Sequence, residues 1–398
     1  MNILLAKGQS QYEGTRTFTD HAAAAFVEQG HSAFVLDLTT IQVSFDNIVR
    51  AAAAHGPYDL IFTINYLGEV RNAEGRYLSE VLGAPHVVWH TDYILSQQQR
   101  LEATAQSTPI LVVDPTQIDA VKSIYGEARF DHLGFFPHPA VGQPAPEDAD
   151  VKAFEANRPI PILWSGGFQR PGNPAWNDGK PATKKIFDDA FDLAMSVEWM
   201  APHIALDTVV RSRGLDMNQP GNREARKAAW LIDREVRMAR RFEFIRRLAK
   251  TGLPIYICGA GWDSQLYRFK NVQYAGAVSM SRMVELMRES RIVLNTNGNF
   301  GGGSHERPFS ALLAGAACFT DYSQYYGEVF EDGGDVAMFR WKSLAGDLGK
   351  LEALHADPQA SFAMAQRGKV KVIENHTWAK RIEIVLGAAA SARVAAAA

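Results

Sequence analysis

Short apolar segments alternate with longer amphipathic segments through the first 140 residues, and this alternation predicts strands separated by helices. The apolar segments have little polar character on either face, so each strand is expected to be buried on both sides. Parallel sheets covered by helices on both faces have this property. The predicted strands are 2–6, 33–38, 58–64, 86–89 and 110–113, and the predicted helices are 22–29, 45–54 and 76–82.

A second alternation of the same kind follows residues 140–161, a segment rich in Pro, Asp and Glu that we interpret as a linker. Residues 169–181 show no clear periodicity and are expected to form an exposed insertion. Two tandem, doubly wound parallel sheets are therefore expected, and ligands of such α/β folds bind beyond the carboxyl ends of the strands. The predicted strands are 160–164, 254–258, 272–274, 291–295 and 317–320, and the predicted helices are 222–250, 264–268, 281–289, 307–314 and 360–386.

The composition is that of an ordinary globular protein, because 46% of the 398 residues are hydrophobic and 21% are charged. The 41 basic and 44 acidic residues give a net charge of -3, so we expect no nucleic-acid partner. Cys258 and Cys318 are too few for a disulfide framework or a zinc site. Residues 1–7 lack the features of a signal peptide, and no apolar run approaches the roughly 18 residues of a membrane span. We therefore expect a cytoplasmic protein without an integral membrane segment.

The loop 258–263 follows a predicted strand and precedes a predicted helix. Gly259 and Gly261 allow the backbone to approach a ligand closely, and the helix N-terminus offers N–H groups to a phosphate. The dinucleotide-binding pattern is incomplete, because Ser264 replaces its third glycine and the strand 271–275 ends without an acid. A tight turn without a ligand is the alternative interpretation.

A second glycine-rich loop, 301–303, separates the strand that ends at Asn295 from a helix that begins near Arg307 and Pro308. This arrangement directs backbone N–H groups and the guanidinium of Arg307 toward an anion such as a diphosphate. The alternative is a flexible surface loop with a solvated arginine.

These segments together resemble the C-terminal half of GT-B glycosyltransferases, and within that group the spore-maturation-protein (CgeB-like) glycosyltransferases of bacteria. The resemblance covers residues 230–387, and the N-terminal half agrees in architecture and in the sequence Trp89-His90-Thr91-Asp92. The segments that carry it are 259–263, 274–278, 283–287, 291–295, 307–316 and 376–381.

The resemblance implies a GT-B fold of two Rossmann-like domains with a cleft between them. Residues 1–150 would form the acceptor-side domain and residues 151–370 the domain that binds a nucleotide-sugar donor. Residues 371–398 would form a helix that returns to the N-terminal domain, followed by an Ala-rich tail. The implied activity is transfer of a sugar from this donor to a hydroxyl of a glycan, protein or small-molecule acceptor.

Several residues acquire expected roles in donor binding from this resemblance. Asn295 and Arg307 would approach the diphosphate, and the helix from Arg307 would start beneath the ribose. Ser310 stands where relatives usually have the glutamate that binds the ribose, so donor binding is expected to be weaker or differently arranged. The remaining members of the expected donor site lie in glycine loops and are Gly8, Gly166, Gly259, Gly261 and Trp262.

The N-terminal half contributes three candidate catalytic residues. Glu13 belongs to the loop 7–14 that follows the first strand, and this loop is otherwise a simple strand-to-helix connection. His90 and Asp92 follow a strand on a comparable edge, where a histidine near a carboxylate can take a proton from an acceptor hydroxyl. A packed or hydrogen-bonded histidine is the alternative.

No metal and no other cofactor is expected. Asp148-Ala149-Asp150 matches the Asp-x-Asp pattern of metal-dependent enzymes, but no apolar strand precedes it, and Arg307 can neutralise a leaving diphosphate instead. The basic residues Arg234, Arg237 and Arg241 either face an acidic partner or form an ordinary solvated helix face. Two other functions stay open, which are a catalytically silent nucleotide-sugar-binding or assembly protein and a nucleotide-sugar epimerase.

Overall fold

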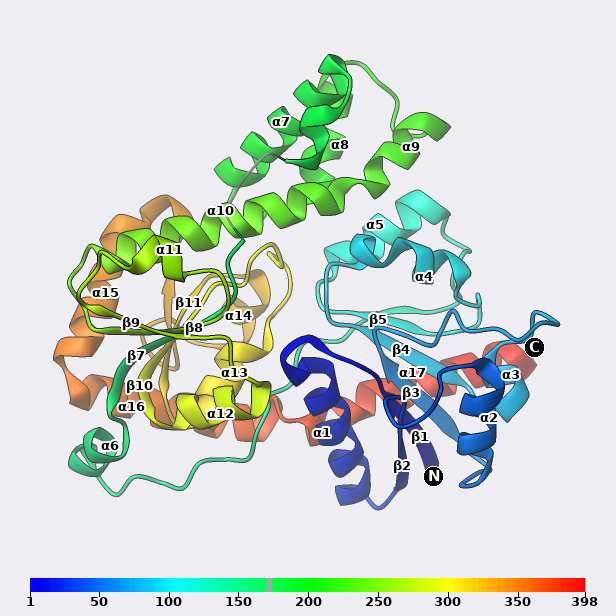
Figure 1. Cartoon of the computed structure of the whole chain (residues 1–398), viewed down its shortest axis with the longest axis horizontal. Coiled ribbons are helices and arrows are strands. Elements are labelled where there is room, and N and C mark those ends of the chain that lie inside the picture. Colours follow the sequence, from blue (N-terminus) through cyan, green and yellow to red (C-terminus); the bar gives the residue numbers. More distant parts are fainter. Residues whose placement is uncertain (170–173, 398) are drawn as a thin grey trace. The chain divides into compact units, whose positions relative to one another are not determined.

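The computed structural model describes residues 1–169 and 174–397 (Figure 1). The chain forms two compact units. The first, here the N-terminal unit, contains Met1–Pro139 together with the chain from Thr377 onward, and the second, here the C-terminal unit, is Ala140–His376. None of the described helices combines the length and the apolar character that a bilayer crossing requires.

The N-terminal unit is built on a six-stranded parallel sheet with the strand order β2-β1-β3-β4-β5-β6. Every residue of β3, β4 and β5 is buried, which explains the continuous apolar character of these segments. The strands are β1 (Asn2–Lys7), β2 (Ser32–Asp37), β3 (Leu60–Ile64), β4 (His86–His90), β5 (Ile110–Val112) and β6 (Leu133–Phe135). The helices are α1 (Gly14–Glu28), α2 (Phe45–Ala53), α3 (Leu78–Leu82), α4 (Gln98–Ala103), α5 (Thr116–Tyr125) and α17 (Trp378–Ala397), with the short helices η1 (Gln11–Glu13) and η2 (Ile94–Gln97).

The C-terminal unit repeats this design with the strand order β12-β11-β10-β7-β8-β9, again all parallel. Figure 1 shows α10 and α11 on one side of this sheet and α12 and α13 on the other. The strands are β7 (Ile160–Ser165), β8 (Ile255–Cys258), β9 (Val272–Gly276), β10 (Ser290–Asn295), β11 (Ala317–Asp321) and β12 (Ala337–Phe339). The helices around the sheet are α6 (Val151–Asn157), α10 (Ala229–Ala249), α11 (Asp263–Leu266), α12 (Met280–Arg288), α13 (Glu306–Leu313), α14 (Gln324–Val329), η4 (Trp341–Ser343), α15 (Leu344–Ala356) and α16 (Pro358–Asn375).

The connection from β7 to β8 contains more helix than the sequence pattern predicted. The helices α7 (Pro181–Ser196), α8 (Pro202–Ser212) and α9 (Pro220–Lys227) pack on one another and on α10 (Figure 1). The predicted helix 222–250 is divided into α9 and α10. Of the predicted exposed insertion 169–181, residues 170–173 lie outside the described residues. Trp176, within the short helix η3 (Ala175–Asp178), is buried and stacks on Phe187, which the expectation missed. Ala175 and residues 178–181 are exposed as expected.

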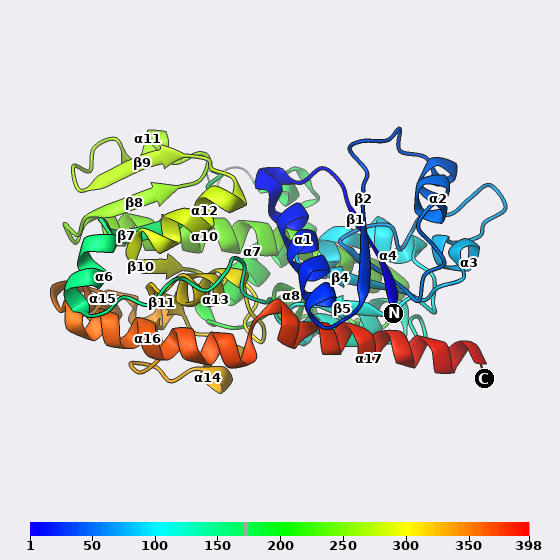
Figure 2. The same cartoon turned by 90° about the horizontal axis from the view of Figure 1, so that it is seen from below.

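The last predicted helix, 360–386, is two helices in the structure. α16 ends at Asn375, His376 leaves the helical region at φ -129°, and α17 begins at Trp378. Figure 2 shows the two helices following each other along the chain. The break coincides with the second passage of the chain between the units, since α16 belongs to the C-terminal unit and α17 to the N-terminal unit, where it packs on α1.

Candidate functional site

Two loops at the carboxyl ends of neighbouring strands, 166–168 after β7 and 259–261 after β8, pack directly on each other. A Cβ atom at Gly259 would lie 2.3 Å from the carbonyl oxygen of Gly166, and one at Gly261 would lie 2.0 Å from that of Phe168. Both glycines also have positive φ, at 135° and 91°. The loops are joined by backbone hydrogen bonds from Gly166 N to Cys258 O (2.9 Å) and from Phe168 N to Ala260 O (2.8 Å). These glycines are therefore required by the contact between the two loops.

The side chain of Trp262 packs against the loops 166–168 and 259–261. Its side chain is fully buried, stacks on Phe168 with ring centroids 4.5 Å apart, and donates a hydrogen bond from Nε1 to the carbonyl oxygen of Gly166 at 2.7 Å. The indole therefore holds the loops in position, and a direct contact of Trp262 with a nucleotide stays a prediction.

Asn295 and Arg307 lie together, at the end of β10 and in the first turn of α13. Arg307 Nη1 donates to Asn295 Oδ1 at 2.8 Å, and Asn295 Nδ2 donates to Thr320 Oγ1 at 3.0 Å. Asn295 is fully buried and Arg307 is 8% exposed. The amide of Asn295 therefore orients a guanidinium whose apolar stem is covered by protein.

His305 and Glu306 surround the same guanidinium. Nη2 of Arg307 lies 3.2 Å from His305 Nε2, and His305 Nδ1 contacts Glu306 Oε2. The pKa of His305 is lowered to about 4, chiefly by burial and also by the positive charge of Arg307, while the carboxylate of Glu306 acts in the opposite direction. His305 is consequently neutral at pH 7 and leaves Arg307 its full charge.

Two further arginines reach this place from α10. Arg241 Nη1 donates to the carbonyl oxygen of Gly167 at 3.1 Å, which links the glycine loops to the arginines. Burial lowers the pKa of Arg241 to about 9, and the charges of Arg237 and Arg307 contribute to this shift. We call Arg237, Arg241 and Arg307 the arginine cluster. Such close cations are expected where an anion is bound.

The sequence placed Arg237 and Arg241 on a helix face without linking them to Arg307. Their spacing of four residues puts them on one face of α10, where Arg237 also pairs with Asp233 at 3.4 Å. Arg234 pairs with the neighbouring Glu235 at 3.0 Å. The spacing of Arg237 and Arg241 was therefore the signal that they share a helix face. Their proximity to Arg307 could not be predicted, because α13 lies far away in the sequence.

The hydroxyl of Ser310 is used within the protein. Oγ donates to the carbonyl oxygen of Glu306 at 2.9 Å and accepts a hydrogen bond from Val141 N at 2.9 Å, and the residue is 2% exposed. Ser310 thus ties the segment after Ala140 to α13. Contact of this hydroxyl with a ribose stays a prediction.

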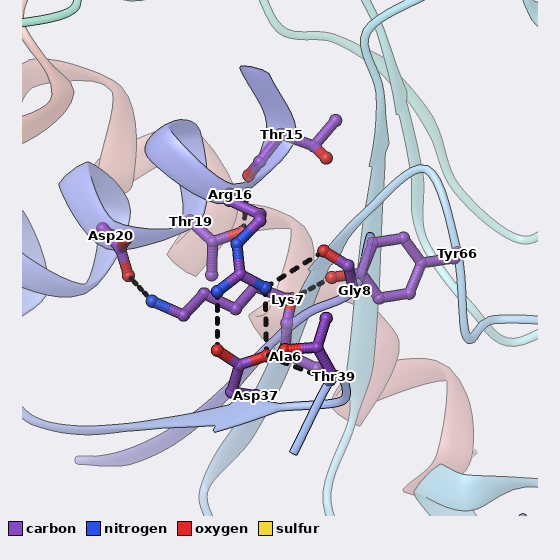
Figure 3. Close-up of polar contacts among 10 residues, drawn as sticks. All are labelled: Ala6, Lys7, Gly8, Thr15, Arg16, Thr19, Asp20, Asp37, Thr39 and Tyr66. Atoms are coloured by element: carbon purple, nitrogen blue, oxygen red, sulfur yellow. Dashed lines mark hydrogen bonds and ion pairs between the residues drawn. The ribbon is translucent and has the colours of Figure 1, made fainter. Parts of the chain in front are cut away.

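In the N-terminal unit, the loop that contains Gly8 borders a polar hollow of about 550 Å³. Figure 3 shows Arg16 of α1 directed at Asp37, to which its two terminal nitrogens donate at 3.0 and 2.6 Å, while Nη1 also donates to Gly8 O at 3.2 Å. The guanidinium holds the pKa of Asp37 well below its usual range. The hollow is lined by Gln9, Ser10, Gln11, Arg16 and Thr39.

Glu13 belongs to the same loop and is exposed. Tyr12 and Glu13 both adopt left-handed backbone conformations, at φ 55° and 63°, which non-glycine residues rarely do. The carboxylate therefore stands on a strained turn at the start of α1.

His90 and Asp92 lie at the end of β4 in different environments. His90 is 2% exposed, its Nδ1 has no hydrogen-bond partner in the described part of the chain, and burial lowers its pKa to about 3, with a smaller contribution from Arg100. Asp92 is exposed, and its Oδ2 accepts a 3.4 Å hydrogen bond from Asn65 Nδ2. His90 is therefore a neutral imidazole with one free nitrogen.

The predicted residues thus form separate groups. Gly166, Gly259, Gly261 and Trp262 build the paired loops of the C-terminal unit. Asn295 and Arg307 form a hydrogen-bonded pair in the same unit, with Ser310 one turn further along α13. The predicted residues of the N-terminal unit are Gly8, Glu13, His90 and Asp92. Among the described residues, no three His, Cys, Asp or Glu side chains gather as metal ligands.

The fold is similar to that of known proteins. Residues 237–387 match the protein family described as glycosyl transferase-like, and no curated protein sequence matches the chain. Among solved structures, sucrose-phosphate synthase from Thermosynechococcus elongatus is 10% identical with a TM-score of 0.55, over 100% of both chains. Anabaena HepE in complex with UDP-glucose is 11% identical with a TM-score of 0.54, over 98% of this chain and 100% of that one. These similarities confirm the predicted GT-B fold.

Proposed function

Because the chain has the GT-B fold and carries a glycosyltransferase domain over residues 237–387, we propose that it transfers a sugar from a nucleotide-sugar to a hydroxyl group. The acceptor is a glycan, a protein or a small molecule, and no metal takes part. The observation that carries the proposal is the arginine cluster at the carboxyl ends of the strands, where parallel sheets bind ligands.

The chemistry explains why cations are needed there. The acceptor oxygen forms a bond to the anomeric carbon, the bond from that carbon to the diphosphate oxygen breaks, and the acceptor proton passes to a base. The nucleoside diphosphate leaves with one more negative charge than it carried in the donor. Guanidinium groups held in place before the reaction stabilise this charge, as a metal ion does in other enzymes. Asn295 and neutral His305 act as positioning residues for Arg307.

For the proton we propose the N-terminal candidates Glu13, His90 and Asp92. Burial lowers the pKa of His90 to about 3, so the imidazole is unprotonated at neutral pH but is a weak base. For His90 to take the acceptor proton, substrate binding must raise this pKa toward neutrality. Asp92 and Glu13 are exposed carboxylates and accept a proton without prior desolvation.

The proposal extends to the subfamily and to the cellular location of the protein. The resemblance of residues 230–387 supports placement among the CgeB-like glycosyltransferases of bacteria. Two reduced, buried cysteines, Cys258 and Cys318, support a cytoplasmic location.

Calorimetric titration with UDP-glucose and other nucleotide-sugars tests donor binding. UDP-glucose is the first choice because the HepE and alpha-glucosyltransferase structures, the latter with a TM-score of 0.51 and 10% identity over 98% of this chain, contain it. Arg307→Gln is expected to weaken binding at least tenfold. Arg234→Gln is the matched control, because Arg234 lies on the same helix as Arg241 but pairs with Glu235. Absence of binding by the whole panel at millimolar concentration contradicts the proposal.

A catalytically silent nucleotide-sugar-binding or assembly protein is the second candidate, and the engaged hydroxyl of Ser310 favours it. Donor hydrolysis or transfer that disappears in His90→Ala, Asp92→Asn or Glu13→Gln would exclude it. An epimerase is separated from both by the formation of a new nucleotide-sugar in the absence of any acceptor.

A further inference from the structure

A second hollow in the C-terminal unit, of about 280 Å³, lies between α10 and the segment from Trp262 to Phe269. Its floor is formed by side chains that are almost completely buried, those of Ile245, Trp262 and Leu266. The rings of Phe242 and Phe269 are partly buried beside them. None of the lining residues belongs to the arginine cluster. The hollow therefore has an apolar floor and lies outside the arginine cluster, and it shares the side chain of Trp262 with the paired loops.

Three cations surround this apolar floor. Arg246 and Lys250 come from the last turns of α10, and Arg268 follows α11. All three are exposed, and in the described part of the chain none of them forms an ion pair with a carboxylate. Arg247, the neighbour of Arg246, points to Glu243 at 2.6 Å instead. No acidic residue lines the hollow, so all of its charged lining residues are cations.

We propose that this hollow binds a small organic acid with an aromatic or aliphatic body. The body rests on Ile245 and Leu266, where removal of apolar surface from water is favourable. The acid group meets Arg246, Lys250 and Arg268 at the rim, where charge-assisted hydrogen bonds form.

The shape and the charge together select this class of ligand. An inorganic anion would pair with the cations but would leave the apolar floor in contact with water. A neutral apolar compound would cover the floor but would form no ion pair with the cations. The volume of about 280 Å³ is just below the roughly 300–1,000 Å³ of ordinary small-ligand pockets, so the ligand is small. One ring system with one acid group satisfies all three constraints.

Titration of the full chain with 2-naphthoate tests the proposal, and 2-naphthylmethanol is the neutral compound of nearly the same shape. We expect saturable binding of the acid with one site per chain, and at least tenfold weaker binding of the alcohol. The double variant Lys250→Gln/Arg268→Gln is expected to bind the acid at least tenfold more weakly. Gln265→Trp, which fills the opening from the rim, is expected to abolish binding.

Two controls locate the bound acid. Arg247→Gln removes a cation from the same turn of α10 outside the hollow, and Arg307→Gln removes one from the arginine cluster. Both are expected to leave the affinity for 2-naphthoate unchanged, and thermal unfolding verifies that every variant is folded. Equal affinity for the alcohol, equal affinity of the double variant, or loss of binding in Arg307→Gln overturns the proposal. Because no nucleotide is present, none of these outcomes depends on the transferase activity.

Discussion

The loop glycines show how a contact distant in the sequence constrains a single residue. Gly259 and Gly261 were recognisable in the sequence as a loop after a strand, but the reason for each glycine is a carbonyl group of another loop about 90 residues earlier. Arg307 was likewise recognisable from its place at a helix start. Its partner Asn295 and the converging Arg241 depend on tertiary contacts that no local pattern contains.

Gly261→Ala is expected to lower the free energy of unfolding of the C-terminal unit by roughly 2–4 kcal/mol. The new Cβ would lie 2.0 Å from the carbonyl oxygen of Phe168, and the residue would also have a positive φ of 91°. The matched control is Gly276→Ala, where φ is 75° but no atom lies within 4 Å of the new Cβ. That variant is expected to cost about 1–2 kcal/mol. Denaturant unfolding measures both, and equal losses would show that the loops move apart freely.

Asp37→Asn is expected to lower the stability of the N-terminal unit at pH 7 by about 1–2 kcal/mol, because it removes the paired hydrogen bonds with Arg16. The pKa of Asp37 in the folded protein is below its unfolded value, so its stabilisation is full above about pH 4 and disappears as the pH falls further. The difference between wild type and variant should therefore shrink in acid. Asp20→Asn, which removes the exposed pair with Lys7 seen in Figure 3, is the control and should cost less than about 1 kcal/mol. A difference independent of pH would contradict the assignment.

At the level of elements, ten of the twelve strands in the described residues could be predicted, because a parallel strand buried on both faces needs a continuous apolar run. The sheet-edge strands β6 and β12 were missed, since each has only three residues. The helices α7 and α8 were missed for a physical reason. Their burial is against one another and against α10, so their apolar stripes are short, and their clearest signal is the proline in the first turn at Pro181 and Pro202. The break between α16 and α17 was missed because each helix packs in a different unit, which no local pattern indicates.

Trp378 at the start of α17 tests how strongly this helix is held. Its ring lies 5.6 Å from that of Trp89 and 6.3 Å from that of Phe18, within the N-terminal unit. Trp378→Ala is therefore expected to destabilise this unit by about 3–5 kcal/mol. Val370→Ser on the exposed surface of α16 should stay within about 0.5 kcal/mol of wild type. Thermal unfolding followed by circular dichroism compares the two, and a small effect of Trp378→Ala would mean that α17 contributes little to the core.

At the scale of the whole molecule, two units with separate cores are joined where the chain passes from Pro139 to Ala140 and from His376 to Thr377. The arginine cluster lies entirely in the C-terminal unit, and the aromatic cluster around Trp378 lies entirely in the N-terminal unit. The sequence suggested two halves because the strand–helix alternation stops and restarts, but it contains no direct signal for the sheet order within each half.

This separation makes the last prediction possible. UDP that binds to the arginine cluster stabilises the C-terminal unit by about 2.7 kcal/mol at a concentration of 100 Kd, since a ligand of the folded state shifts unfolding by mass action. Trp378→Ala acts on the other unit, so in scanning calorimetry UDP should raise one thermal transition while the substitution lowers another. The two effects should add within about 0.5 kcal/mol in the variant with UDP present. If UDP instead raises the transition that Trp378→Ala lowers, the nucleotide binds to the N-terminal unit and the role proposed for Arg307 is wrong.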